Sequence, residues 1–195
     1  MTTPHIVSHE EWLKARQARL AREKAFGRPR DALARSGPVL WEKVEKGYVF
    51  DAPEGKVTLA DLFAGKSRLV VRHFMFGLDS NEGCPSCSSW IDNFNGIDVH
   101  LARPDTAFVL VAHRPIARIE AYRKRMGWTV RWVSSLNNDF NFDYGVSFQP
   151  CGQPDGEETP GLCVFRKGDD GAIYRSCSTS ARDLEDPDRV LGVAS

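Results

Sequence analysis

The sequence carries no net charge and has no hydrophobic run long enough to cross a membrane. Over 195 residues, 26 Lys and Arg residues balance 26 Asp and Glu residues. Proteins that bind phosphate backbones need a clustered surplus of Lys and Arg, so this balance argues against nucleic acid as a partner. The longest apolar run, Ala107 to Ala112, is far shorter than the ~20 residues that span a bilayer, and we expect no membrane partner.

The first residues, Met1 to His5, also lack the basic segment and apolar run of a secretory signal, which predicts a soluble, cytoplasmic protein. A chain of this length buries roughly 70% of its extended surface on folding, so it needs neither disulfides nor a metal ion for stability. In a reducing compartment the 5 Cys residues are therefore expected to be catalytic or buried, rather than a disulfide framework.

The sequence divides into a helical arm, a main domain and a C-terminal tail, at residues 1–40, 41–182 and 183–195. In the arm, Ser8 and Glu11 have the spacing of a capping box, and the residues after them predict an amphipathic helix. Gly27-Arg28-Pro29 is expected to break this helix, and Gly37-Pro38 to end a second short one. We interpret the many Lys and Arg residues of the arm as a solvated face. The alternative is a docking arm for a second subunit, which would make a homodimer possible.

Strand and helix patterns alternate along the main domain, which indicates an α/β fold with a central sheet flanked by helices. Strands are predicted at Arg68–Phe76, Thr106–Ala112 and Trp128–Val133, and helices at Leu59–Phe63, Cys84–His100 and Pro115–Gly127. Residues 137–144 are expected to form a loop. Hairpins are predicted around Pro53-Glu54-Gly55 and around Gly168–Gly171, which joins Leu162–Arg166 to Ala172–Cys177. This order predicts a sheet that is parallel at first and ends in an antiparallel hairpin.

The most informative segment is Gly83-Cys84-Pro85-Ser86-Cys87, which follows a predicted strand and opens a predicted helix. A sulfur at a helix N-terminus lies near unpaired N–H groups and the positive end of the helix dipole, which favours the thiolate. In Cys-X-X-Cys sites the thiol pKa falls from about 8.5 to roughly 3.5–7.5. We expect Cys84 to attack a disulfide and Cys87 to release the product from the mixed disulfide. Pro85 suits the first helical turn, because its missing N–H would have no partner there.

Three other interpretations of this motif stay open. Cys-X-X-Cys is half of a zinc site, but the sequence has no second pair of Cys or His at close spacing, so we expect no metal. The thiols can also be inert and buried. Finally, the domain can be a non-catalytic binding module that uses the aromatic segment Phe140 to Tyr144 as its interaction surface.

A late proline adds to the pattern. Thr159-Pro160 directly precedes an apolar strand, and the order of strand, Cys84–Cys87 helix, strand, helix, Pro160 and hairpin resembles the thioredoxin fold. Several segments more closely resemble a bacterial family of predicted dithiol-disulfide isomerases, often given as a domain of unknown function: Val71–Gly77, Glu82–Cys87, Glu120–Trp128, Trp132–Ser135 and Asn138–Gly145. The resemblance covers roughly His9 to Arg182, whereas Asp183–Ser195 departs from the family pattern.

The resemblance implies a thiol-disulfide oxidoreductase or isomerase that needs no bound cofactor and acts on a protein or small-molecule disulfide. It also implies a site shaped by Pro85, Ser86, Thr159 and Pro160, with Pro160 in the cis form beside the dithiol. The similar peroxiredoxins place a Thr three residues before their reactive Cys, and that position here is Asn81. We therefore favour disulfide exchange over peroxide reduction, which is kept as an alternative.

Further residues are candidates for a supporting role. His73 precedes the dithiol and can orient a sulfur, although a buried core His is favoured, and Arg114 either meets an anionic substrate group or lies on the surface. Trp90 belongs to a possible aromatic wall, for which core packing is the favoured alternative: Trp90, Trp128, Trp132, Phe140, Phe142 and Tyr144. Cys163 and Cys177 flank the second hairpin and are interpreted as buried packing residues, with a second redox pair as the alternative. Cys151 is expected in an exposed loop.

Overall fold

The structure is a computed structural model that describes residues 5–36, 40–76, 81–101, 103–147 and 158–180. Backbone contacts divide the chain into two units, residues 1–40 and 41–195. Cys151 and the tail lie outside the described residues.

The first unit contains helix α1, His9–Ser36. Its expected capping box is present, because the Glu11 carboxylate accepts from the Ser8 N–H at 2.9 Å and the Ser8 hydroxyl accepts from the Glu11 N–H. The predicted break at Gly27-Arg28-Pro29 is wrong, since the helix continues through Pro29. A proline removes its own backbone donor and its ring crowds the carbonyl four residues earlier, but the Ala, Arg and Lys residues around it have high helix propensity, which favours helix on both sides.

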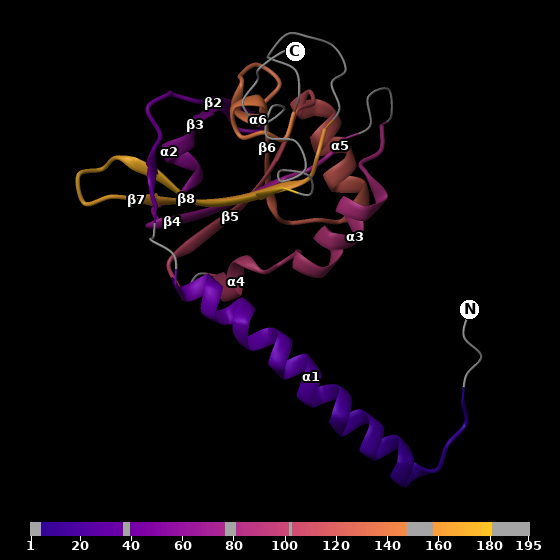
Figure 1. Cartoon of the computed structure of the whole chain (residues 1–195). Coiled ribbons are helices and arrows are strands. Elements are labelled where there is room, and N and C mark those ends of the chain that lie inside the picture. Colours follow the sequence, from indigo (N-terminus) through magenta and orange to yellow (C-terminus); the bar gives the residue numbers. More distant parts are fainter. Residues whose placement is uncertain (1–4, 37–39, 77–80, 102, 148–157, 181–195) are drawn as a thin grey trace, which may run out of the picture. The chain divides into compact units, whose positions relative to one another are not determined.

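The second unit is built on a mixed sheet with helices on both faces (Figure 1). Within the described residues the strand order is β1-β8-β7-β4-β5-β6-β2-β3. The strands are β1 Glu42–Lys43, β2 Val49–Ala52, β3 Gly55–Thr58, β4 Arg68–His73, β5 Thr106–Ala112, β6 Arg131–Ser134, β7 Gly161–Lys167 and β8 Ile173–Ser180. Strands β4, β5 and β6 are parallel, whereas β7 and β8 are antiparallel. The expected parallel sheet with an antiparallel hairpin is therefore confirmed.

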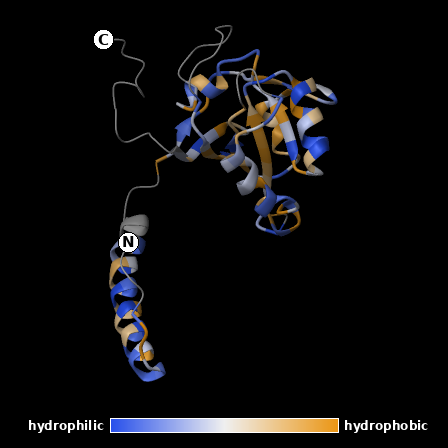
Figure 2. Cartoon of the chain, turned by 90° about the vertical axis from the view of Figure 1, so that its right-hand side faces the viewer, coloured by the Kyte–Doolittle hydropathy of each residue, from blue (hydrophilic) through white to orange (hydrophobic). Residues whose placement is uncertain are grey.

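The two faces of the sheet carry separate hydrophobic clusters. The helices are α2 Leu59–Leu62, α3 Pro85–Phe94, α4 Asp98–Leu101, α5 Ile116–Met126 and α6 Phe140–Asp143. Helices α2 and α6 supply Leu62 and Phe140 to one cluster, and α3 and α5 supply Ile91 and Ile119 to the other. Figure 2 shows the hydrophobic strands in orange between these helices. The strands therefore separate a "helix α3 face" from a "helix α6 face", the names used below.

Several element boundaries differ from the sequence prediction. The helix predicted over Cys84–His100 is divided into α3 and α4, because the backbone turns extended at Asn95, with a ψ of 126°, and then left-handed at Gly96, with a φ of 83°. Strand β4 ends at His73 instead of Phe76, and the loop expected over residues 137–144 contains the short helix α6. Strand β5 and both predicted hairpins are confirmed. Among the described residues, no helix is long and apolar enough to cross a membrane.

Candidate active site at the start of helix α3

Cys84 lies at the N-cap of α3, where the chain returns toward the end of β4. Its N–H donates to the Met75 carbonyl at 3.0 Å, and an isolated bridge pairs Phe76 with Gly83. A Cβ at Gly83 would lie 2.5 Å from Cε1 of Phe74, so only glycine fits this approach. Pro85 occupies the first helical turn as predicted. The local sequence therefore fixes the first thiol at a helix N-terminus.

The two thiols of the motif differ in access to solvent. Cys84 is half-buried, whereas Cys87, one helical turn further on, is 2% exposed. A hydrogen bond links the two side chains. Burial raises the pKa of the Cys87 thiol to about 11, opposed by a backbone hydrogen bond from Met75 and reinforced by Cys84. The low thiol pKa expected for this motif does not hold for Cys87, because loss of hydration outweighs the local donors.

Arg72 is the cation beside this pair, and the sequence analysis missed it. Its guanidinium lies 4.8 Å from the centre of the Trp90 ring, and Nη1 donates to the Gly161 carbonyl at 3.2 Å. The positive charge of Arg72 lowers the pKa of the Cys87 thiol. Residues alternate between faces along β4, so the position of Arg72 on the helix α3 face was readable from the pattern of the strand.

A hydroxyl pair holds the first turn of α3 against α5. The Ser88 hydroxyl lies 2.8 Å from both the Cys84 carbonyl and the Tyr122 hydroxyl. Tyr122 comes from α5 and is buried in the same cluster as Cys87. Ser86 and Pro85 are exposed beside Cys84. The accessible edge of the site is thus formed by the motif's own two central residues.

The segment before β7 lies next to the end of β4. Gly161 pairs with His73, and the Thr159 N–H donates to the Val146 carbonyl at 2.9 Å. No peptide bond in the described parts of the chain is cis, so the expected cis form of Pro160 is wrong. Thr159 is buried, and its hydroxyl has no hydrogen-bond partner among the described residues. Gly161, the residue after Pro160, accepts from Arg72 through its carbonyl.

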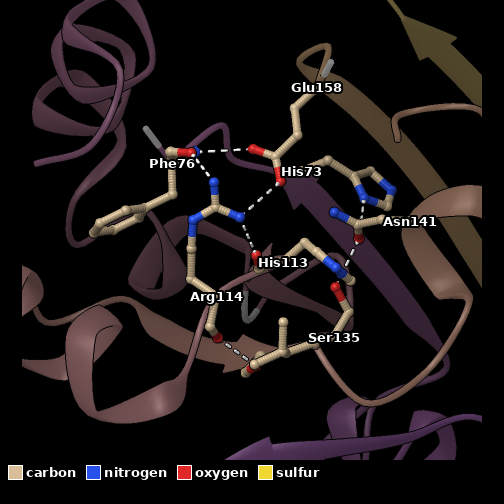
Figure 3. Close-up of polar contacts among 9 residues, drawn as sticks. His73, Phe76, His113, Arg114, Ser135, Asn141 and Glu158 are labelled. Carbon is tan, nitrogen blue, oxygen red and sulfur yellow. Dashed lines mark hydrogen bonds and ion pairs between the residues drawn. The ribbon is translucent and has the colours of Figure 1, made fainter. Parts of the chain in front are cut away.

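His73 lies on the helix α6 face, away from α3. Its ring stacks on Phe140 with centres 5.4 Å apart, and Nδ1 lies 3.2 Å from the side-chain oxygen of Asn141. That oxygen also accepts from the Ser135 hydroxyl at 3.0 Å (Figure 3). Burial lowers the pKa of His73 to about 4, against the effect of Asn141. These contacts describe the buried core histidine favoured by the sequence, and not a partner of the sulfurs.

Arg114 is 7% exposed, so the alternative that it lies on the surface is wrong. Nη2 donates to the Phe76 carbonyl at 3.0 Å and Nη1 to the His113 carbonyl at 2.7 Å. Nη1 also lies 3.8 Å from the Glu158 carboxylate, which accepts from the Phe76 N–H at 3.0 Å (Figure 3). Burial raises the pKa of Glu158 to about 7, opposed by Phe76 and Arg114. The guanidinium of Arg114 thus donates to two backbone carbonyls.

The remaining candidates are the two cysteines of the second hairpin and the aromatic residues. Cys163 is buried and pairs with Ser178, whereas Cys177 is exposed and pairs with Val164. Because neighbouring residues of a strand face opposite ways, Cys163 and Cys177 do not face each other, and the expected burial of Cys177 is wrong. Core packing is confirmed for three aromatic residues, Trp128, Trp132 and Phe140, but Phe142 is exposed. The described residues contain no group of His, Cys, Asp and Glu that could hold a metal ion.

Comparison with known proteins places the whole chain in a family. The model of a family described as "Bacterial protein of unknown function (DUF899)" matches residues 1–193. The chain belongs to this DUF899 family. Because the match includes the tail, the expected departure of Asp183–Ser195 from the family pattern is wrong. No curated protein sequence matches this DUF899 chain.

Several solved structures similar to the DUF899 chain are peroxiredoxins. Peroxidoxin BcpB from Mycobacterium tuberculosis has a TM-score of 0.56 at 12% identity, covering 79% of this chain and 97% of that one. The bacterioferritin comigratory protein of Xanthomonas campestris gives 0.53 at 12%, covering 78% and 94%. Peroxiredoxin Q of Xylella fastidiosa gives 0.53 at 13%, covering 73% and 88%. At such identities the likeness establishes the fold, and the predicted thioredoxin-like α/β fold is confirmed.

Proposed function

We propose that this DUF899 protein is a thiol-disulfide oxidoreductase in which Cys84 is the nucleophile and Cys87 the resolving thiol. The Cys84 thiolate attacks one sulfur of a substrate disulfide, so that a mixed disulfide forms and the other substrate sulfur leaves as a thiolate. Cys87 loses its proton and attacks the Cys84 sulfur, which releases the second substrate thiolate. The substrate gains two electrons, the protein becomes the Cys84–Cys87 disulfide, and a low-molecular-weight thiol reduces it again.

The observation that carries this proposal is the unequal pair of thiols at one helix start. The half-buried Cys84 can meet a substrate, while Cys87 is 2% exposed and hydrogen-bonded to Cys84. Because the pKa of Cys87 is raised to about 11, its thiol stays protonated while it waits. Exclusion of water then favours attack on the neighbouring sulfur, which is already within contact distance. Such a division of labour is what a nucleophile and a resolving thiol require.

The test uses the full chain with oxidised glutathione as the disulfide. We expect the reduced protein to reduce it, Cys84→Ser to abolish the reaction, and Cys87→Ser to accumulate a glutathione adduct on Cys84 that mass spectrometry detects. Cys177→Ser is the matched control, because Cys177 is an exposed thiol on β8. Full turnover by Cys84→Ser would sink the proposal. A pair that never forms a disulfide across glutathione redox buffers would favour the binding-module alternative.

Peroxide reduction is the second candidate, because several solved structures of similar fold are peroxiredoxins, one of them described with an alkyl peroxide reduction activity. The Cys84 thiolate would attack a peroxide oxygen, giving a sulfenic acid and an alcohol, and Cys87 would condense with it to a disulfide and water. Asn81, which is exposed, stands where the peroxiredoxins have a Thr three residues before their reactive Cys, and this difference favours disulfide exchange. Peroxide consumption with a thiol donor, compared with glutathione reduction in the same preparation, separates the two reactions.

A further inference from the structure

A buried charged pair lies against the backbone that precedes the dithiol. Both side chains are 9% exposed, and their charged atoms, Nη1 of Arg114 and Oε1 of Glu158, are 3.8 Å apart. Arg114 donates to the Phe76 carbonyl and Glu158 accepts from the Phe76 N–H, each at 3.0 Å. Figure 3 shows the two side chains meeting at the Phe76 backbone. The pair therefore satisfies both backbone groups of one residue, and we call it the Phe76 clamp.

The backbone held by this clamp is also hydrogen-bonded to both cysteines of the motif. Glu158 accepts from the N–H of the peptide unit whose carbonyl, that of Met75, accepts from the Cys84 N–H. The other end of Met75 provides the backbone hydrogen bond to Cys87. The Phe76–Gly83 bridge joins the same segment to the residue before Cys84. A displacement of Met75 and Phe76 would therefore reach Cys84 and Cys87 together.

The Met75–Phe76 segment lies beyond the end of β4, so the pairing of regular strands does not fix its position. Strand β4 ends at His73, and after the Phe74 N–H donates to the Val111 carbonyl the backbone leaves the ladder. Burying a carboxylate and a guanidinium is costly unless hydrogen bonds satisfy them, and an apolar pair would pack as well. The clamp lies between the end of the β4 ladder and the backbone that is hydrogen-bonded to Cys84, which fits a role in positioning the thiols.

We propose that Glu158, together with Arg114, is a positioning residue that holds the Met75–Phe76 backbone so that Cys84 and Cys87 meet in the geometry for disulfide formation. This inference rests on the proposed function, since it assigns the pair to the same dithiol. Charge-assisted hydrogen bonds are about twice as strong as neutral ones, so a carboxylate and a guanidinium hold a peptide more firmly than amides or hydroxyls.

The first measurement follows backbone amide exchange by NMR, at a pH above the pKa of Glu158. We expect Glu158→Leu to speed exchange of the Cys84 amide about tenfold, because the Phe76 N–H loses its acceptor. Glu158→Gln keeps an acceptor oxygen and should change this rate about twofold or less. The Leu110 amide in β5 reports general loosening. Unchanged exchange at Cys84 in Glu158→Leu, or equal acceleration at Cys84 and Leu110, would overturn the inference.

The second measurement is the equilibrium constant for forming the Cys84–Cys87 disulfide in glutathione buffers, a quantity that loss of stability alone does not move. Glu158→Leu should lower it about tenfold, and Glu158→Gln much less, because the effective concentration of one thiol at the other falls with their alignment. Val57→Ala, which destabilises the helix α6 face, is the control and should leave it unchanged. An equal fall in Val57→Ala and Glu158→Leu would contradict a positioning role.

Failure of the clamp and failure of the proposed function give different results. Exchange at Cys84 does not depend on any redox reaction, so it judges the clamp even if the protein reduces no disulfide. If Glu158→Leu does not fold because it leaves the Arg114 charge buried, the double variant Glu158→Leu/Arg114→Met removes both charges. It should fold and show the same accelerated exchange; normal exchange in that variant would contradict the clamp.

Discussion

Adjacent residues of one strand serve opposite faces of the sheet in different ways. Arg72 points to the helix α3 face, where its charge acts on Cys87, and His73 points to the helix α6 face, where it stacks on Phe140. Both are polar side chains brought inside by the alternation of β4. His73 is held neutral by burial, whereas Arg72 stays half-buried with a ring and a carbonyl around its charge. The same strand thus builds a packed core on one side and a polarised site on the other.

Cys87 and Cys163 provide a second comparison between the two faces, this time of thiol chemistry. The two thiols are similarly hidden, at 2% and 1% exposure, but they belong to different clusters. Cys87 lies beside the half-buried thiol of Cys84 and the cation of Arg72. Cys163 instead lies in the core of the helix α6 face among the side chains of β4 and β7. Burial alone therefore does not distinguish the two thiols; Cys87 differs from Cys163 in having a second thiol, Cys84, beside it at a helix start.

The largest expected difference between the faces is chemical. When the reduced protein reacts once with oxidised glutathione, Cys87→Ala should release one reduced glutathione instead of two, because no thiol of the protein remains to release the adduct from Cys84. Cys163→Ala should still release both and lose about 1 kcal/mol of stability, since it only empties a small volume in a packed core. The reaction is followed by release of reduced glutathione, and stability by urea unfolding. A comparable loss of released glutathione in Cys163→Ala would show that the two faces are not chemically separate.

On the helix α6 face, His73 should make the stability of the folded protein depend on pH. Its pKa is about 4 in the folded protein against an ordinary value of 6.5. Between these values the unfolded chain binds the proton and the folded one does not, so stability is complete above pH 6.5 and falls as the pH drops. The loss amounts to roughly 3 kcal/mol by pH 4.

The measurement compares the pH dependence of urea unfolding in His73→Asn, where this contribution should vanish, with that in the native chain. His100→Asn is the matched control, because His100 is exposed on α4 and should leave the curve unchanged. Parallel curves for His73→Asn and the native chain would mean that His73 is not held neutral by burial.

The local features of both faces could be predicted from the sequence, whereas the contacts between distant segments could not. The helix start at Cys84, the strand Thr106–Ala112 and the burial of His73 follow from short-range periodicity and turn chemistry, and they are confirmed. The pairing of Glu158 with Phe76 joins residues 82 positions apart, which no local pattern encodes. The surface alternative for Arg114 is the instructive error: a charged residue after a strand usually faces solvent, but here the Phe76 and His113 carbonyls accept from its buried guanidinium.

A smaller effect is expected from adding one methyl group on the helix α3 face. In Gly83→Ala the new Cβ would lie 2.5 Å from Phe74, whose ring is enclosed by Trp132 and Trp128. Since the ring has little room to move, the substitution should cost about 1–3 kcal/mol, measured by urea unfolding. Gly47→Ala is the control, because no atom lies within 4 Å of its Cβ position. Equal stability of the two variants would argue against close packing at the N-cap of α3.

The smallest effect tests whether the charge on β4 acts on the resolving thiol. Arg72→Met removes the cation that lowers the pKa of Cys87, so fewer Cys87 thiolates form and the glutathione adduct on Cys84 should be released about threefold more slowly. Arg166→Met is a close control, because Arg166 also lies over a tryptophan, Trp41, at 5.4 Å. Single-turnover release of glutathione from the preformed adduct measures this step alone. If both variants slow it equally, the effect belongs to packing of an arginine on a ring; if only Arg72→Met does, the polarity of the helix α3 face is part of the chemistry.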